Sequence, residues 1–290
     1  MCQQAGVSRA GYYRSLAEKH PDEEEQQVRA AIQEIALLHK RRYGVRRIAV
    51  EVRARGLPAG RDRVHRMMRE DNLLAIRYRR YVITTHSQHE LDVYLNLAAR
   101  MKPDAANQLW VADITYIRLK HEFVYLAVVL DAWSRRVIGW HLDRTLAARL
   151  AVTALERAIA ARQPQPGLVH HSDRGIQYAS HDYVELLKQH KFTPSMSRPA
   201  NPYDNASCES FMKTLKQEEI YCTRYRDLED LEAHLQEFLE GYYNRLRLHS
   251  ALGYQTPEQF ERQNRTGAAG SIADAPKMSF FRHEKSTDPI

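Results

Sequence analysis

Apolar residues in the first quarter of the chain recur every three or four positions, which is the spacing of one helix face. This pattern predicts three helices, at residues 22–42, 46–55 and 61–72. The acidic residues Asp22 to Glu25 suit the positive N-terminal end of the first helix. Glycine and proline in the GLPAG stretch, residues 56–60, interrupt the chain between the second helix and the third. A short turn of this kind between two helices is typical of a helix-turn-helix unit.

The pattern changes to alternating and continuous apolar runs after about residue 105. Three β-rich runs separated by short polar turns predict three strands, at residues 109–119, 123–131 and 136–142. Helices and strands then alternate: a helix at 146–162, a strand at 168–171, a helix at 181–190, a strand at 191–197, a helix beginning near Asn205 and an amphipathic helix at 228–243. Three consecutive strands followed by alternating elements predict an α/β domain, a mixed sheet flanked by helices.

These elements divide the chain into five parts. We expect an N-terminal segment at 1–21, a basic helix-turn-helix domain at 22–80, a linker at 81–105, a catalytic core at 106–264 and a loose tail at 265–290. The N-terminus lacks the apolar stretch of an export signal, and no apolar run is long enough to cross a membrane. Three cysteines without metal-finger spacing indicate free thiols. A protein of the cytoplasm is therefore expected.

Positive charge is concentrated in the predicted helical domain. The chain has a formal net charge of +7, and residues 39–80 hold 14 Lys and Arg against 4 Asp and Glu. A localised basic block indicates a polyanionic partner. The alternative is an ordinary solvated helix face, which seldom needs so many arginines. The third helix supplies the candidate DNA contacts Arg61, Arg63, Arg66 and Arg69.

Three carboxylates are candidates for catalysis. Asp113 lies inside the first predicted strand, where burying a charge is costly unless it is paired or bound to a metal. Asp173 follows a later strand, in the loop HSDRG, and Glu209 lies on a predicted helix. On that helix Asn205 stands about one turn before Glu209, whereas Lys213 and Lys216 stand one and two turns after it on the same face.

Each carboxylate alone has an ordinary structural explanation. A strand Asp bonds a neighbouring backbone, a loop Asp forms a turn, and a helix Glu is solvated. Together they fit one chemical task, because cleavage of a phosphodiester uses a carboxylate cage that holds two hard cations about 3.5–4 Å apart. A zinc site is disfavoured, because His170 and His171 are adjacent in a strand and point to opposite faces, and no cysteine cluster accompanies them.

The spacing of these carboxylates and the residues around them resemble the motifs of one family. Asp113, Asp173 and Glu209, with 35 residues between the last two and Lys216 seven residues on, resemble the Asp-Asp-Glu signature of retroviral-integrase-like transposases. The closest resemblance is to the OrfB-type transposases of bacterial insertion sequences. It is carried by W..DITYI at 110–117, HSDRGIQY at 171–178, PYDNASCESF at 202–211 and YYNRLRLHSALGYQTPEQF at 242–260.

The resemblance implies an RNase H-like core with a five-stranded mixed sheet, preceded by a small all-α helix-turn-helix domain. It also implies cleavage and strand transfer at element ends, dependent on two Mg²⁺ (or Mn²⁺) ions bound by Asp113, Asp173 and Glu209. Lys216 is then expected near the scissile phosphate, and Asn205 either near the DNA or at the start of the Glu209 helix. Lys213, Arg247 and His249 are further candidate contacts to a DNA backbone.

The family resemblance also implies partners. These are double-stranded DNA, both terminal repeats and target, a homo-oligomer on paired ends, and the product of an upstream reading frame, separate or fused. The family's location, the bacterial cytoplasm at the nucleoid, is expected here too. The loop before the Glu209 helix has Pro199 and Ala200 where a glycine is expected.

Two other functions are compatible with the same residues. A DNA-binding regulator would use the basic helices on an inactive core, and a nuclease would cut DNA without joining it. The three intact carboxylates argue against the regulator, but they serve cutting and joining equally.

Overall fold

The computed structural model describes residues 8–9, 23–75, 94–197 and 205–265. The expectations for segment 1–21, for most of the linker at 81–105, for Pro199 and Ala200 and for the tail after residue 265 fall outside these residues. No helix of the described part is long and apolar enough to cross a membrane.

Three helices form the N-terminal bundle: α2 (Glu23–Leu38), α3 (Val45–Ala54) and α4 (Arg61–Glu70). Their apolar faces meet in a core that includes Ile32, Ile48 and Met67, each fully buried. Gly56 has φ of +79°, and the amide of Leu57 returns to the carbonyl of Val52, which ends α3 with the left-handed turn that glycine adopts most easily. The helix-turn-helix arrangement predicted for this region is confirmed.

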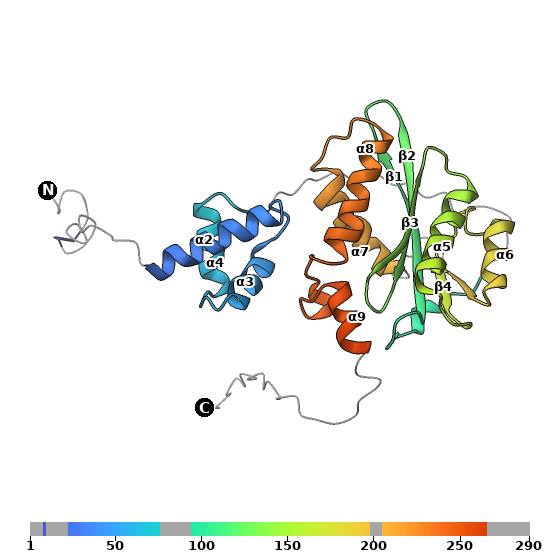
Figure 1. The fold of residues 1–290 in the computed structure, drawn as a ribbon, viewed down its shortest axis with the longest axis horizontal. Helices are drawn as coiled ribbons and strands as arrows, with labels where there is room; N and C mark the ends of the chain where they lie inside the picture. Colours follow the sequence, from blue (N-terminus) through green and yellow to red (C-terminus); the bar gives the residue numbers. More distant parts are fainter. Residues whose placement is uncertain (1–7, 10–22, 76–93, 198–204, 266–290) are drawn as a thin grey trace, which may run out of the picture.

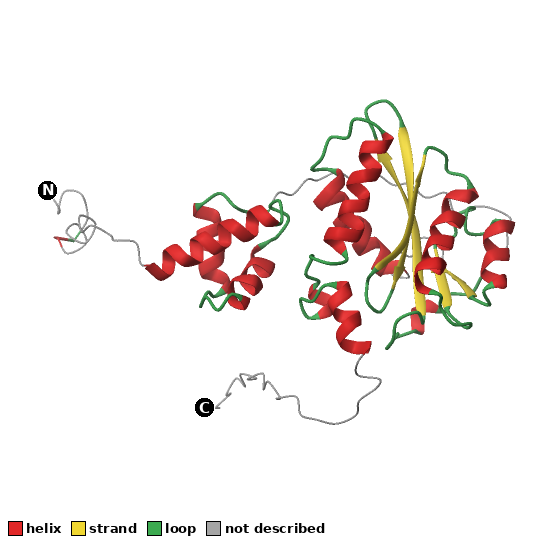
Figure 2. Ribbon diagram, in the orientation of Figure 1, coloured by secondary structure: helices red, strands yellow, loops and turns green. Residues whose placement is uncertain are grey.

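The second domain is built on a five-stranded sheet (Figure 2). Its strands are β1 (Leu109–Arg118), β2 (Phe123–Asp131), β3 (Val137–Asp143), β4 (Val169–Ser172) and β5 (Thr193–Met196), in the order β3-β2-β1-β4-β5. The first three strands pair antiparallel, whereas β4 and β5 run parallel to β1. This is the mixed sheet of an RNase H-like fold, so the predicted fold class is confirmed.

Helices cover both faces of this sheet (Figure 1). One face packs against α5 (Ala148–Arg162) and α6 (His181–Gln189), and the other against α7 (Ala206–Leu215) and α8 (Leu228–Gln236). Alternation along β1 sends Trp110 and Ala112 to the α5 side and Val111 and Ile117 to the α7 side. Asp113 has the parity of Val111 and Ile117, so it belongs to the α7 face.

Two helical regions differ from the sequence-based expectation. The helix expected at 228–243 is regular only through α8, after which residues Glu237–Tyr243 (η4) form a π-helix. Helix α7 likewise continues into a π-helical segment, η3 (Lys216–Ile220). The short 3₁₀ turns η1 (Ala98–Arg100) and η5 (Ser250–Leu252) and helix α9 (Pro257–Arg265) complete the described elements.

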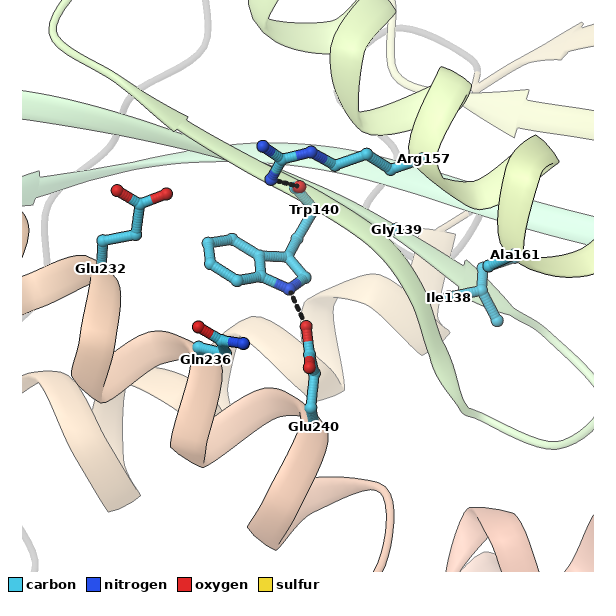
Figure 3. A pocket seen from close by; sticks show the side chains of 8 residues that line it. All are labelled: Ile138, Gly139, Trp140, Arg157, Ala161, Glu232, Gln236 and Glu240. Carbon is cyan, nitrogen blue, oxygen red and sulfur yellow. Dashed lines mark hydrogen bonds between the residues drawn. The ribbon is translucent and has the colours of Figure 1, made fainter.

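Side chains cover the outer edge of the sheet at β3. The amide side chain of Asn244 accepts from the N–H of Val137 at 3.0 Å and donates to its carbonyl at 2.9 Å. The Arg157 guanidinium donates to the carbonyl of Trp140 at 2.9 Å, beside a hollow of about 400 Å³ (Figure 3). In that hollow the Trp140 indole donates to Glu240 at 3.1 Å. Edge groups satisfied in this way do not recruit another strand.

Candidate active site

Asp113 sits in the middle of β1, partly exposed, on the face covered by α7. Its Oδ1 accepts a hydrogen bond from the amide of Ile114 at 2.9 Å. Burial, and then the negative charge of Asp173, raise the pKa of Asp113 to about 7, and the charge of Glu209 adds to this effect. The ammonium of Lys216 acts in the opposite direction. The site therefore concentrates negative charge around one carboxyl group.

Parallel pairing of β4 with β1 brings Asp173 to this place. Val111 is opposite His171 in the register, so the residue that follows β4 emerges beside Asp113. The Asp173 Oδ1 accepts from the amide of Gly175 at 2.9 Å, and a Cβ on Gly175 would stand 3.0 Å from that oxygen. Glycine thus allows the loop to turn closely around the carboxylate.

Glu209 lies in the first turn of α7, and its side chain is exposed. Asn205, the residue before this helix, donates from Nδ2 to the carbonyl of Ala112 at 3.1 Å. That bond ties the start of α7 to β1 immediately beside Asp113. Asn205 makes no side-chain capping bond to α7, so the structure places it as a link between the strand and the helix.

The three carboxylates share one region without forming a closed cage. They interact electrostatically through Asp113, yet no three His, Cys, Asp or Glu side chains in the described residues are close enough to hold a metal ion as placed. The donor chemistry nevertheless fits Mg²⁺ or Mn²⁺, because hard divalent cations take carboxylate oxygens. A cation would also offset the charge that raises the pKa of Asp113.

The two lysines that follow Glu209 differ in their surroundings. Lys213 is exposed. Lys216 is half-buried, with its Nζ 5.6 Å from the centre of the Tyr116 ring. Burial lowers the pKa of Lys216, and the Asp113 carboxylate acts against that shift. Lys216 is thus the lysine that belongs electrostatically to the carboxylate region.

The arginines of α4 lie on the surface of the helical domain. Arg61, Arg66 and Arg69 are exposed, and Arg63 is partly exposed. Arg63 pairs with Glu24 of α2, and Arg66 lies 3.2 Å from Glu70 and 3.5 Å from Glu25. Acidic residues therefore neutralise part of the basic face.

Two candidate DNA contacts are buried, which corrects the sequence-based expectation. Arg247 is 5% exposed and His249 is 6% exposed. Arg247 forms a two-pronged ion pair with Glu218, at 2.7 and 2.9 Å. His249 packs edge-on against the ring of Tyr243, and burial lowers its pKa to about 3. The segment that carries them folds back into the core, so neither side chain reaches the surface.

Tyr178 is a neighbour of the carboxylates that sequence reasoning did not single out. Its ring is 2% exposed, and its hydroxyl makes no hydrogen bond within the described residues. Burial and the charges of Asp173 and Asp113 raise its pKa well above the usual value. Tyr178 closes the HSDRGIQY stretch, so the motif itself was the available signal.

Comparison with known families supports this combination of domains. The HTH-like domain family matches residues 22–81, and two integrase core domain families match residues 103–202 and 190–257. The "Insertion element IS600 uncharacterized 31 kDa protein" of Shigella sonnei is 37% identical over 273 residues, covering 93% of this chain and 100% of that protein. "Transposase InsF for insertion sequence IS3A" of Escherichia coli (strain K12) is also 37% identical, over 269 residues, covering 91% of this chain and 93% of that protein.

One solved structure also gives an alignment. One chain of the simian T-cell lymphotropic virus intasome, in complex with PP2A regulatory subunit B56 gamma, aligns with a TM-score of 0.47 and 17% identity. The alignment covers 85% of this chain and 80% of that one.

A helix-turn-helix-like domain followed by an integrase core defines a DNA-binding polynucleotidyl transferase. Within that class, the chain belongs to the InsF transposase family of insertion sequence IS3, and its function is DNA transposition.

Proposed function

We propose that the chain cleaves DNA at the ends of its element and transfers the strand to a target, with Asp113, Asp173 and Glu209 holding two Mg²⁺ (or Mn²⁺) ions. The observation that carries the proposal is the parallel register of β1 and β4, which brings Asp173 beside Asp113 on the face where α7 carries Glu209. Burial and these neighbouring carboxylates raise the pKa of Asp113. A partly buried carboxylate among like charges is costly unless a cation joins it.

The chain's own residues would prepare the reacting groups. Asp113 and Asp173, held by β1 and by the loop after β4, would form the fixed part of the cage. Glu209 is exposed at the start of α7, so its side chain can turn toward the two aspartates. Bound divalent ions supply a more acidic water and stabilise the charge that develops on the phosphate.

Two displacements at phosphorus follow from this arrangement. In the first, the oxygen of a water bonds to the phosphorus of the scissile phosphodiester and the 3′ oxygen leaves, taking a proton. In the second, the freed 3′-hydroxyl oxygen bonds to a target phosphorus and loses its proton, and the 3′ oxygen of the target strand leaves and takes up a proton. Neither displacement consumes an oxidant or a nucleotide.

DNA contacts are part of the proposal. Lys216, close to the carboxylates, would face the scissile phosphate, with the exposed Lys213 further along the same helix. Arg61, Arg63, Arg66 and Arg69 would bind the terminal repeats through the surface of α4. Asn205 would act by fixing the start of α7 to β1. A homo-oligomer on paired ends and the product of an upstream frame complete the proposed assembly.

A cleavage and joining assay tests the proposal. Purified protein, Mg²⁺ and a labelled duplex with the element's terminal repeats should give cut and joined products, and Asp113→Asn should give neither. Shifted but uncut DNA with both proteins would indicate a DNA-binding regulator. Cutting without joining would indicate a nuclease.

A further inference from the structure

The helix that carries Glu209 reaches from the carboxylate region to the helical domain. Helix α7 continues into η3 without interruption, so Glu209 and Glu218 belong to one helical rod. At a rise of 1.5 Å per residue they lie about 14 Å apart along its axis. A force applied at η3 is therefore transmitted to the residue that carries the third carboxylate.

Five charged side chains meet where η3 contacts the helical domain, and we name them the interdomain ion cluster. Arg42 and Arg47 belong to the helical domain, Glu218 and Glu219 to η3, and Arg247 to the segment after η4. Arg42 pairs with Glu219, and their side chains are 10% and 4% exposed. Glu218 takes the two-pronged bond from Arg247 and lies 3.6 Å from Arg47. Buried guanidinium and carboxylate groups keep one another in place, because separating either would leave an uncompensated charge.

Backbone contacts fix the same interface. The Nε of Arg42 donates to the carbonyl of Glu218 at 2.8 Å, and the Nε of Arg47 donates to the carbonyl of Leu248 at 2.8 Å. Tyr43, fully buried, donates through its hydroxyl to Leu246 at 3.2 Å and accepts from the amide of Leu248 at 2.8 Å. The segment between α2 and α3 is therefore held at several independent points.

Aromatic rings also pack against the guanidinium of Arg42. Its guanidinium lies 4.5 Å from the centre of the Tyr242 ring and 5.2 Å from that of Phe238. Both rings belong to η4, so Arg42 is enclosed between the two π-helical segments, η3 and η4. Stacking of this kind adds to the ion pair and suits the planar guanidinium better than it would a lysine.

The cluster is separate from the surface that faces DNA in the proposed function. Arg42 and Arg47 lie before and within α3, whereas the exposed arginines are on α4. Helix α4 packs on α3, so a displacement of α4 reaches the cluster through α3. The path from α4 to η3 thus consists of packed side chains and bonds.

We propose that Arg42 and Arg47 are positioning residues for strand cleavage, which set Glu209 through Glu218, Glu219 and the α7–η3 rod. Capture of an element end by the helical domain and placement of the third carboxylate are thereby coupled. The proposal rests on the proposed role of Glu209 in catalysis.

Single-turnover cleavage at saturating protein tests this coupling. Arg42→Gln and Glu219→Gln should each lower the cleavage rate about tenfold or more, within the usual range of coupling between sites. Affinity for the terminal-repeat duplex should change less than about threefold, because neither residue contributes a phosphate contact. The double variant should fall no further than the single variants, since both remove one interaction.

Amide hydrogen exchange supplies a readout that is independent of catalysis. In metal-free protein, both variants should exchange faster over residues 206–220 than the wild type, and core strands β1 and β2 should be unchanged. The matched control is Glu237→Gln, which removes an exposed ion pair between η4 and Lys40 (3.3 Å; side chains 70% and 63% exposed). It should match the wild type in rate and in exchange.

The possible failures are distinguishable. If Glu209→Gln cleaves like the wild type, the proposed function is wrong. If Glu209→Gln is inactive while Arg42→Gln cleaves at the wild-type rate on saturating DNA, the coupling is overturned. Should Arg42→Gln not fold, Arg42→Lys decides, since it keeps the charge and loses the planar fork: slower cleavage with unchanged affinity supports the coupling, and a wild-type rate refutes it.

Discussion

The two ends of the α7–η3 rod both carry acidic residues, but in opposite electrostatic settings. Near Glu209, burial and then the neighbouring carboxylates of Asp173 and Glu209 raise the pKa of Asp113 to about 7. Near Glu218 and Glu219, three arginines surround the two carboxylates; the Arg42–Glu219 and Arg247–Glu218 pairs are nearly buried, whereas Arg47 is 22% exposed. At the Glu209 end the protein supplies little positive charge to balance the carboxylates, so we call it the poorly compensated end. At the Glu218 end, arginines of the protein balance the carboxylates.

This difference separates a site that would bind a cation from a contact that holds two domains together. Strand pairing and the Asn205 bond hold like charges together at the first end, where a cation supplied from solution would complete the site. At the second end the protein provides both signs, so the contact serves to fix one domain on another. Acidic composition alone would not have told the two apart.

The largest effect is expected from the poorly compensated end. Asp113→Asn should lower the rate of DNA cleavage on the order of 1,000-fold, because several kcal/mol of metal-based stabilisation of the transition state would be lost. Gel analysis of a labelled terminal-repeat duplex measures this loss. If Asp113→Asn kept more than about a tenth of the wild-type cleavage rate, the metal-binding role that distinguishes the two ends would be contradicted.

The same chemical change made at each end should affect stability differently. Glu219→Gln should lower the free energy of unfolding by about 3–5 kcal/mol, because it leaves Arg42 buried without its charge partner. Glu209→Gln, on an exposed side chain, should change it by less than about 0.5 kcal/mol. Urea unfolding of both variants tests the contrast, and equal losses would contradict it.

Metal-free protein should depend on pH through Asp113. Its pKa in the folded protein, about 7, exceeds the ordinary 3.8, so the folded state binds more protons than the unfolded state between these values. The resulting stability is present below about pH 4 and is lost as pH rises through about 7. At pH 8 without metal, Asp113→Asn should therefore be the more stable protein, by about 1–3 kcal/mol.

Added Mg²⁺ should reverse that order by stabilising only the wild type. Thermal unfolding at pH 5 and pH 8, with chelator and with Mg²⁺, measures both effects. If the wild type in chelator were most stable at pH 8, and more stable there than Asp113→Asn, the raised pKa of Asp113 would be contradicted.

The smallest effect is expected from the exposed arginines of α4. Arg69→Ala should reduce the salt dependence of DNA affinity by about one unit of slope, because one phosphate contact is lost. Arg42→Gln should leave that slope unchanged, since its guanidinium is buried in the interdomain ion cluster. Fluorescence anisotropy over a series of salt concentrations distinguishes exposed from buried arginines.

The spacing of apolar residues predicted the helices and strands well, because most of these elements bury a defined face. The runs at 123–131 and 109–119 became β2 and β1 almost without change. Asp113 could be assigned to the face of Val111 and Ile117 from alternation alone. The π-helical turns at η3 and η4 were not predicted, because such turns are rare and occur within α-helices, so a helical pattern does not reveal them.

Contacts between residues far apart in the sequence were the other feature that the sequence did not predict. Arg247 carries a charge in a polar stretch, and nothing in the local sequence shows that Glu218 will enclose it. The contacts of Tyr43 with Leu246 and Leu248 span about 200 positions and leave no periodic trace. The carboxylate spacing was visible through family resemblance, whereas the interdomain ion cluster required three-dimensional coordinates.

The most direct test of the proposed metal site is to count the Mn²⁺ ions bound per chain. Electron paramagnetic resonance, with the terminal-repeat duplex present, would be used to compare the wild type with Asp113→Asn and with the control Glu237→Gln. Two bound ions in the wild type and the control, with loss of binding in Asp113→Asn, is the expected result. Equal occupancy in all three proteins would contradict the assignment of Asp113, Asp173 and Glu209 as the metal site.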